Sequence, residues 1–190
     1  ARLLLQTALE WCEQHESHLP DWIDPQTGDH GKGTGWPVLA QCLSLVEQAL
    51  HGAGQADQWM GEAAAFLNKL LHQSEDTLPA WQNQSTPVVP TPSGWEGHSL
   101  DLLALCTAEC EALEKLAGRY GDSQAATVWQ SQKQRLVSVL MEHAWNPTTR
   151  LFHDLDHEKG RVPQPTAAGF LPWLSASVRK RVTTDLFRPV

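Results

Sequence analysis

One short stretch of the chain combines side chains that could carry acid–base chemistry. It runs from Ser93 to Asp101 and contains an indole at Trp95, a carboxyl group at Glu96 and an imidazole at His98. Burial beside an apolar surface disfavours the charged form of a carboxyl group, so such a group keeps its proton to a higher pH. A protonated carboxyl group is what a general acid needs. The stretch therefore predicts a site for proton transfer.

The same stretch is also the start of a helix, which leaves a second interpretation open. Ser93 and Glu96 have the spacing of a capping box, in which Glu96 bonds the Ser93 backbone and does no chemistry. His98 either orients a ligand or packs against its neighbours. Asp101, in the first turn, either holds a hydroxyl group of a ligand or bonds water and the loop. Asp21 is a second candidate for the hydroxyl-binding role.

Two motifs recur at one offset and predict a repeated unit. Leu19-Pro20-Asp21-Trp22 precedes Thr34-Gly35-Trp36, and Leu78-Pro79-Ala80-Trp81 precedes Ser93-Gly94-Trp95, with offsets of 78 − 19 = 59 and 95 − 36 = 59. A repeat of this length indicates a supersecondary unit used more than once. Four of the nine tryptophans, Trp22, Trp36, Trp81 and Trp95, fall in these connections. Their flat faces suit the apolar face of a sugar ring; alternatively, each fills a gap between packed helices.

The spacing of apolar residues predicts an all-α fold. Helices are expected over residues 1–15, 37–50, 57–72, 99–119, 123–143 and 177–186. The helix at 37–50 and the first half of the helix at 99–119 are apolar nearly all round, which indicates burial on most sides. The helices at 1–15, 57–72 and 123–143 are apolar on one side, as outer helices are. A small β-hairpin is expected near 151–162.

The connections alternate with this pattern and predict how the helices are arranged. Long connections at 16–36, 73–98 and 144–165 follow one-sided helices, and short connections lead from the buried helices back to one-sided helices. This order predicts a ring of helical hairpins with the buried helices inside. All the long connections then lie on one rim, with the N-termini of the inner helices and their unpaired N–H groups. We expect the functional site on that rim.

Composition excludes several classes of partner. The 190 residues carry a formal net charge of −8, which argues against nucleic acid or an anionic membrane, and the basic run at 179–181 is interpreted as a solvated helix face. No apolar run reaches the length of a membrane span, and no signal peptide is visible. The motifs predict no metal site and no cofactor. The four cysteines lie in apolar helical patterns and are expected to be buried free thiols, which slightly favours a reducing, cytoplasmic compartment.

Several segments together resemble a clan of glycoside hydrolases that includes trehalases, processing α-glucosidases and mannosylglycerate-hydrolase-like enzymes. The matching segments are Pro20-Asp21-Trp22-Ile23, Trp36-Pro37-Val38-Leu39-Ala40, Ser93-Gly94-Trp95 followed by an acid, residues 116–122, Phe152-His153-Asp154 and Ala168-Gly169-Phe170-Leu171-Pro172. The resemblance implies a toroid of six helical hairpins, (α/α)6. It also implies a carbohydrate substrate, with Glu96 as the catalytic acid. Under it, residues 1–190 form one partial domain in which the ring is incomplete.

The chain also departs from the clan. The clan's acid is usually an aspartate, where this chain has Glu96, and its Asp-Leu-Asn-Ala becomes Asp101-Leu102-Leu103-Ala104. The resemblance places the second catalytic carboxylate beyond Val190. We therefore expect a fragment of an inverting glycoside hydrolase acting on an α-linked glucoside or small oligosaccharide. The alternatives are a helical-repeat module that binds carbohydrate without cleaving it, and an inactive relative. The oligomeric state is not predicted, although an incomplete ring should leave an apolar flank exposed.

Overall fold

The structure of the chain is a computed structural model that describes residues 2–15, 20, 27, 29–31, 37–50, 56–72, 78–79, 100–156 and 158–186. Helices dominate these ranges. In chain order, the elements are α1 (Arg2–Gln14), α2 (Leu39–Leu50), α3 (Ala56–Leu71), α4 (Leu100–Tyr120), α5 (Ser123–Val139), the π-helical turn η1 (Leu140–Ala144), β1 (Trp145–Asn146), β2 (Leu151–Phe152), the 3-10 helix η2 (Ala167–Leu174) and α6 (Ala176–Leu186). All six predicted helices are confirmed. Their ends differ from the predicted ends by one or two residues if η1, which continues α5 without a break, is counted as the last part of the fifth helix.

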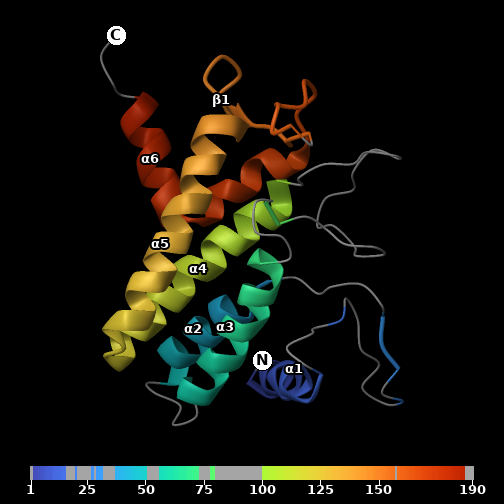
Figure 1. Cartoon of the computed structure of the whole chain (residues 1–190), viewed down its shortest axis with the longest axis vertical. Coiled ribbons are helices and arrows are strands. Elements are labelled where there is room, and N and C mark those ends of the chain that lie inside the picture. The colour runs from blue at the N-terminus through green and yellow to red at the C-terminus, as the bar shows by residue number, and fades with distance from the viewer. Residues whose placement is uncertain are drawn as a thin grey trace.

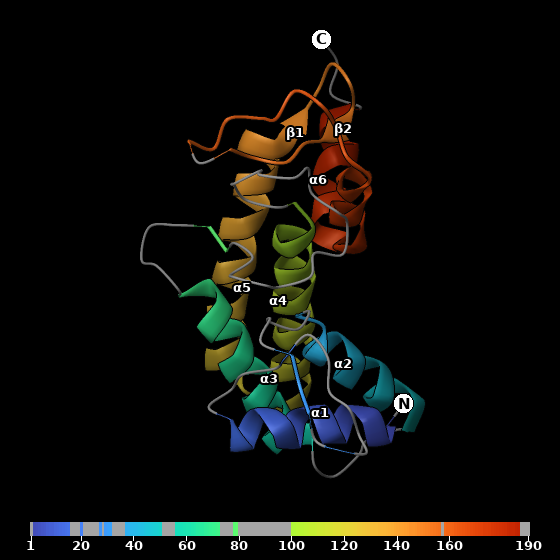
Figure 2. The ribbon, with the colours of Figure 1, turned by 90° about the vertical axis from the view of Figure 1, so that its right-hand side faces the viewer.

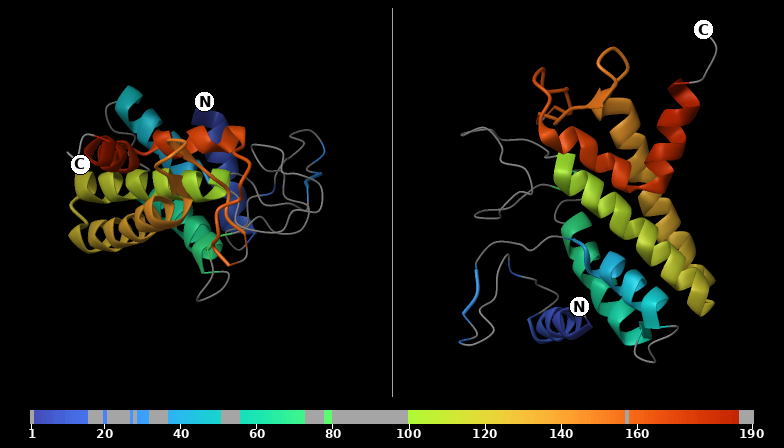
Figure 3. Two further views of the ribbon diagram at one scale, coloured as in Figure 1. Left: turned by 90° about the horizontal axis from the view of Figure 1, so that it is seen from above. Right: turned by 180° about the vertical axis from the view of Figure 1, so that it is seen from behind.

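Helix α4 lies at the centre of the fold (Figure 1). It contacts α5, η2, α2 and α3. Seen from behind and from the side, η2 and α6 lie towards one end of α4, and α2 and α3 towards the other (Figures 2 and 3). Every residue from 100 to 113 is buried, whereas only Leu116 and Ala117 are buried after that. The predicted change from an all-round to a one-sided apolar helix is therefore confirmed.

A tight turn joins α4 to α5 and makes them an antiparallel hairpin. Gly121 has φ +80°, a left-handed conformation that glycine adopts without strain, and it ends α4. Asp122 then caps α5, because its side chain accepts a hydrogen bond from the backbone N–H of Ala125 at 2.9 Å. This short connection between a buried helix and a one-sided helix is the type that the sequence predicts.

The chain turns back after η1 in a small antiparallel sheet. Trp145 of β1 pairs with Phe152 of β2, and their rings lie 4.9 Å apart. The predicted β-element is confirmed, although β2 pairs with β1 rather than with residues 161–162. A single bridge between Leu155 and Arg161 is what forms there. The sheet and this bridge hold the long polar loop that follows η1.

One apolar core runs through all six α-helices, and the outer face of α2 lies outside it. Leu45 is 66% exposed and Cys42 is exposed as well. The prediction that α2 is buried nearly all round is therefore wrong on this face, because no described element packs against it. The thiols of Cys12, Cys106 and Cys110 are free and buried as predicted, and that of Cys42 is not buried.

Among the described residues, no helix has both the length and the apolar character needed to cross a membrane.

Candidate functional site

The start of α4 is where the described part of the chain brings carboxylates together. Asp154 lies in the loop after β2 and is 5% exposed. Its Oδ1 accepts a hydrogen bond from the N–H of Leu100 at 2.9 Å, and its Oδ2 accepts one from the hydroxyl of Thr166 at 2.8 Å. A carboxylate at this place satisfies an otherwise unpaired N–H group and lies at the positive end of the helix dipole. A residue 54 positions away therefore caps α4.

Asp154 also joins two helix starts. Leu100 is the first residue of α4, and Thr166 directly precedes η2. Since one carboxylate bonds both, the N-termini of α4 and η2 lie at the same end of the fold. This is the arrangement expected for two neighbouring inner helices of a hairpin ring.

Asp101 is the single predicted site residue within the described ranges. It occupies the first turn of α4, is 0% exposed, and accepts a hydrogen bond from the N–H of Leu102 at 2.7 Å. It therefore lies within one turn of the contact between Asp154 and α4, so two buried carboxylates share this helix start. Its proposed bond to a substrate hydroxyl stays a prediction. The remaining predicted site residues lie outside the described residues: Asp21, Trp22, Trp36, Trp81, Trp95, Glu96 and His98.

His153 fixes the loop that carries Asp154. Its ring is 2% exposed, with Nδ1 2.8 Å from the carbonyl oxygen of Val162 and Nε2 3.1 Å from the hydroxyl of Thr149. A carbonyl oxygen can only accept, so Nδ1 carries a proton and donates it. The backbone adds a further bond, from the N–H of Val162 to the carbonyl of Asp154 at 2.8 Å. These contacts hold the Asp154 carboxylate in one position.

Gly169 lets η2 approach β2 closely. A Cβ atom at this position would lie 2.6 Å from the backbone carbonyl oxygen of Phe152, a distance that real Cβ contacts do not show. The first turn of η2 therefore packs directly on the strand that precedes His153 and Asp154. Glycine at this position is a requirement of the site's packing, because the opposing atom belongs to the backbone and cannot rotate away.

Two further carboxylates lie at mid-height on α4 and hold the starts of two other helices. Glu109 is fully buried and accepts hydrogen bonds from the N–H groups of Ala40 and Gln41 at the start of α2, and from the side-chain amide of Gln41. Burial raises the pKa of Glu109 to about 7, although these three donors act to lower it. A buried carboxyl group without a cation thus keeps its proton to near neutral pH.

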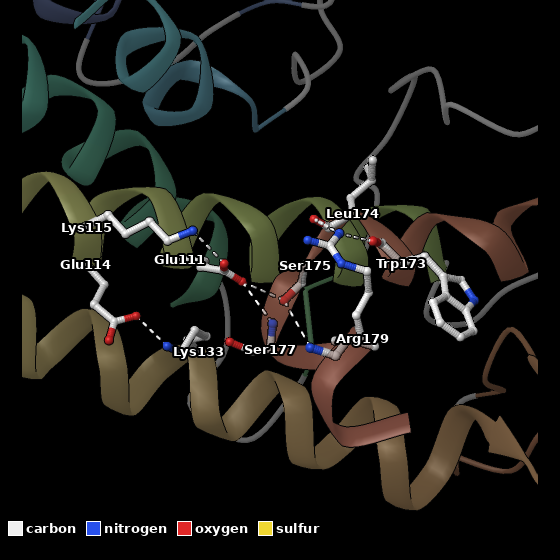
Figure 4. A network of polar contacts seen from close by, with 10 residues as sticks. Glu111, Glu114, Lys115, Lys133, Trp173, Leu174, Ser175, Ser177 and Arg179 are labelled. Atoms are coloured by element: carbon white, nitrogen blue, oxygen red, sulfur yellow. Dashed lines mark hydrogen bonds and ion pairs between the residues drawn. The ribbon is translucent and has the colours of Figure 1, made fainter. Parts of the chain in front are cut away.

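Glu111 faces the start of α6 and has a different environment (Figure 4). It accepts hydrogen bonds from the Ser175 hydroxyl at 2.8 Å and the Ser177 N–H at 3.3 Å, and pairs with the Lys115 ammonium at 2.7 Å. Burial acts to raise the pKa of Glu111, but these donors outweigh it and lower the pKa below the usual value. Glu111 is therefore ionised at neutral pH.

Metal ligation has no support among these carboxylates. The described residues include no group of three or more histidine, cysteine, aspartate or glutamate side chains that could hold a metal ion. The buried thiols are unreactive as well, because burial raises the pKa of Cys12 and of Cys110 to about 12. What the start of α4 offers is carboxylate and hydroxyl chemistry on a fixed backbone.

Comparison with known protein families identifies the family of this chain. The family profile described as mannosylglycerate hydrolase MGH1-like glycoside hydrolase domain matches residues 80–188, which are 109 of the 190 residues. The chain belongs to this glycoside hydrolase family. The family is a mannosylglycerate-hydrolase-like member of the (α/α)6 clan, so the resemblance drawn from the sequence is confirmed. The matched range of this glycoside hydrolase domain contains Glu96 and everything from α4 to α6. Comparisons with curated proteins and with solved structures give no match.

The sequence interpretation missed the residues that build this end of the glycoside hydrolase domain. Phe152-His153-Asp154 carried part of the resemblance, but no role was predicted for Asp154, because its partner Leu100 is far away in the sequence. Thr166 had a detectable signal, since a threonine directly before an apolar run is typical of a helix start. Glu109 and Glu111 had none, because glutamate in a helix is ordinarily solvated.

Proposed function

We propose that the protein containing this chain hydrolyses the glycosidic bond of an α-linked glucoside or small oligosaccharide with inversion, and that Glu96 is its general acid. The observation that carries the proposal is the family match over residues 80–188, which includes Glu96. Within it, Ser93-Gly94-Trp95-Glu96 has the form of the clan's acid loop.

The chemistry assigned to Glu96 is transfer of one proton. Its carboxyl group gives this proton to the leaving oxygen as the bond between that oxygen and the anomeric carbon breaks. A water molecule attacks the anomeric carbon from the opposite face and loses its proton to a second carboxylate. Inverting enzymes hold the two carboxyl groups roughly 6.5–9.5 Å apart to leave room for this water. The resemblance places the second carboxylate outside this chain.

The described start of α4 supports this assignment by its position and its rigidity. Leu100 lies four positions after Glu96, so chain length alone keeps the two Cα atoms within about 14 Å of each other. The loop with Glu96 thus joins the described fold at the helix start that Asp154 caps. Asp101, in the first turn of α4, is the proposed partner of a sugar hydroxyl, with Asp21 in the same role. His98 is the proposed orienting group.

Tryptophan faces are the proposed walls of the sugar site. Trp22, Trp36, Trp81 and Trp95 occupy equivalent places in the two repeated segments. The apolar face of a sugar ring packs well on an indole, which supplies a large flat surface with one donor. We propose that these four side chains lie together on the rim that carries the start of α4.

The test measures sugar release by the full-length protein on a panel of α- and β-linked glucosides and mannosides. The panel includes mannosylglycerate, the compound in the family's name. We expect Glu96→Gln to lower kcat by about a hundredfold or more, since general acid catalysis contributes roughly 10²–10⁴. Glu13→Gln, at an exposed position of α1, is the matched control and should leave the rate unchanged. NMR at early times should show a product anomer opposite to the substrate; retention would exclude inversion.

Binding without cleavage is the second candidate function. The observations that favour it are the glutamate in place of the clan's aspartate, and Leu103 in place of its asparagine. Calorimetric titration of the same panel separates the two functions. Saturable binding of a sugar that is never cleaved, with equal behaviour of the wild type and Glu96→Gln, would establish a carbohydrate-binding module or an inactive relative and would end the catalytic proposal.

A further inference from the structure

A cavity of about 760 Å³ that is open to solvent lies between α5 and α6, away from the start of α4. Lys133 and Ser138 of α5 line one side, and Ser177, Lys180, Arg181 and Thr184 of α6 line the other. Its place on the fold follows from the hydrogen bond between the Ser177 N–H and Glu111, which is eleven residues after Leu100. At 1.5 Å per residue, this is about 16 Å along α4. The cavity is therefore a feature separate from the helix start that Asp154 caps.

The lining of this cavity is positive on a chain that is negative overall. Lys133, Lys180 and Arg181 are its ionisable lining residues, and all three are basic, whereas the chain has a formal net charge of −8. Lys133 pairs with Glu114 of α4, and Figure 4 shows the two side chains pointing towards each other. Lys180 and Arg181 are exposed, and neither forms an ion pair with another described residue. The positive excess therefore comes from α6.

Glu111 and Glu114 of α4 do not cancel this excess, because each is already paired with a lysine. The charge of Glu111, behind Ser177, is offset by Lys115, and that of Glu114 by Lys133. The remaining lining groups are mostly polar: the amide of Gln134 and the hydroxyls of Ser138, Ser177 and Thr184. Two cations beside amide and hydroxyl groups suit a ligand that carries an oxyanion at one end and hydroxyl groups at the other.

We propose that this cavity binds a phosphate monoester of a sugar or of a polyol of similar size. The phosphate lies against Lys180 and Arg181, and the hydroxylated part reaches Gln134 and Ser138. A phosphate monoester carries nearly two negative charges near neutral pH, which matches two cations better than the single charge of a carboxylate. Arginine also presents a planar fork of donors that fits phosphate oxygens. The volume falls within the roughly 300–1,000 Å³ of small-molecule sites. This site does not depend on the proposed glycosidase activity.

The experiment titrates the full-length protein with glucose 6-phosphate by calorimetry or NMR, at low and at physiological ionic strength. Inorganic phosphate, glucose and glucuronate are the comparison ligands. We expect saturable binding of glucose 6-phosphate that weakens with salt, since the charges are exposed and screened. The three comparison ligands should each bind about tenfold more weakly or not at all, because each lacks part of the recognised chemistry.

Two double variants of equal charge assign the site. Lys180→Gln with Arg181→Gln should weaken glucose 6-phosphate binding by about tenfold or more, because charge-assisted hydrogen bonds are lost. Arg119→Gln with Arg150→Gln changes two exposed arginines elsewhere and should leave binding within about twofold of the wild type. Melting curves of both variants verify that the fold is kept.

Four results would each overturn the proposal. They are no saturable binding by the wild type, equal weakening in the two double variants, inorganic phosphate binding as tightly as glucose 6-phosphate, and glucuronate binding as tightly as glucose 6-phosphate. The first two would remove the site itself. The third would remove the sugar from the ligand, and the fourth would remove the preference for phosphate.

Discussion

Glu109 and Glu111 lie two residues apart on α4 and serve opposite neighbours under opposite electrostatic conditions. Residues two apart point to nearly opposite sides of a helix. Glu109 therefore reaches the start of α2, where it meets three neutral donors in a dry environment. Glu111 reaches the start of α6, where it meets Lys115 as well as two neutral donors. The pKa of Glu109 rises to about 7, and that of Glu111 falls.

The comparison shows that a buried carboxyl group can accept hydrogen bonds from the start of a helix whether it is protonated or ionised. A carboxylate that accepts hydrogen bonds from a helix start is stabilised by them, but desolvation costs more when no cation is near. The α2 side of α4 is therefore held by a group that titrates near neutral pH, and the α6 side by a group that is ionised at neutral pH. Three predictions test this contrast and a fourth tests the packing of η2, from the largest expected effect to the smallest.

Glu109→Ala should have the largest effect. It leaves the backbone N–H groups of Ala40 and Gln41 buried without their acceptor, which costs about 1–3 kcal/mol for each group, and it opens a cavity in the core. We expect the free energy of unfolding in urea to fall by about 3 kcal/mol or more. Glu13→Ala, at an exposed position of α1, is the control and should change it by less than about 0.5 kcal/mol. A loss below about 1 kcal/mol would show that water replaces the carboxylate.

Gly169→Ala tests the η2 side through packing instead of charge. The added Cβ would meet the Phe152 carbonyl oxygen at 2.6 Å, so η2 must move away from β2. Overpacking of this kind costs about 1–3 kcal/mol, measured as the free energy of unfolding. Gly118→Ala is the matched control, since a Cβ there meets no atom within 4 Å. It lies in α4 and should stabilise the chain by about 0.5–1 kcal/mol. Equal outcomes for the two variants would mean that η2 does not pack on the strand as described.

The pH dependence of stability should separate the two glutamates by sign. Between about pH 4.5 and 7, Glu109 holds a proton in the folded state that it has lost in the unfolded state. Its contribution to the free energy of unfolding therefore falls as the pH rises through this window, at about 1 kcal/mol per pH unit. The contribution of Glu111 is present above its usual pKa and is lost as the pH falls through its lowered pKa.

Two variants isolate these contributions in urea unfolding curves recorded from about pH 3 to pH 8, because the loss from Glu111 falls below its usual pKa. Glu109→Gln should remove the fall towards neutral pH, and Glu111→Gln should remove a loss at acidic pH. If both variants change the curve in the same direction, the assignment of the proton to the α2 side is wrong.

Lys115→Gln should have the smallest effect. Glu111 is buried, but the Lys115 side chain is 61% exposed, so water can take the place of its ammonium group and the pair should contribute about as little as a surface pair, about 0.2–1 kcal/mol. We expect a loss of about 0.5 kcal/mol in the free energy of unfolding, shrinking further in high salt because the charges are screened. The pKa of Glu111, followed by carboxyl NMR, should rise towards its usual value. No movement of that pKa would show that the serine donors alone hold Glu111 ionised.

The helices could be predicted from the sequence because the apolar spacing that defines them is local. Helix α4 is the clearest example, since both its limits and its change from all-round to one-sided burial were predictable. The exposed face of α2 was not, because Leu45 and Cys42 have the apolar character of buried residues and what covers a face depends on the whole fold. Periodicity identifies an apolar face but does not identify its partner.

Much less of the candidate site was predictable. Asp101 was identified from its place in the first turn of an apolar helix, and the structure shows that its side chain is buried there. Asp154, Glu109 and Glu111 act on backbone groups 54 to 69 residues away, so no local pattern marks them. Glu96 and the four loop tryptophans stay predictions, since they lie outside the described residues.

The tie between Asp154 and Leu100 has a consequence for folding order. Closing a loop of 54 residues costs more entropy than closing the short turn between α4 and α5, so that hairpin should assemble early and the tie late. A contact that forms late is also among the first to open in the native state. The amide of Leu100 should then exchange its hydrogen with solvent faster than the amides in the middle of α4, and hydrogen exchange followed by NMR would measure that difference.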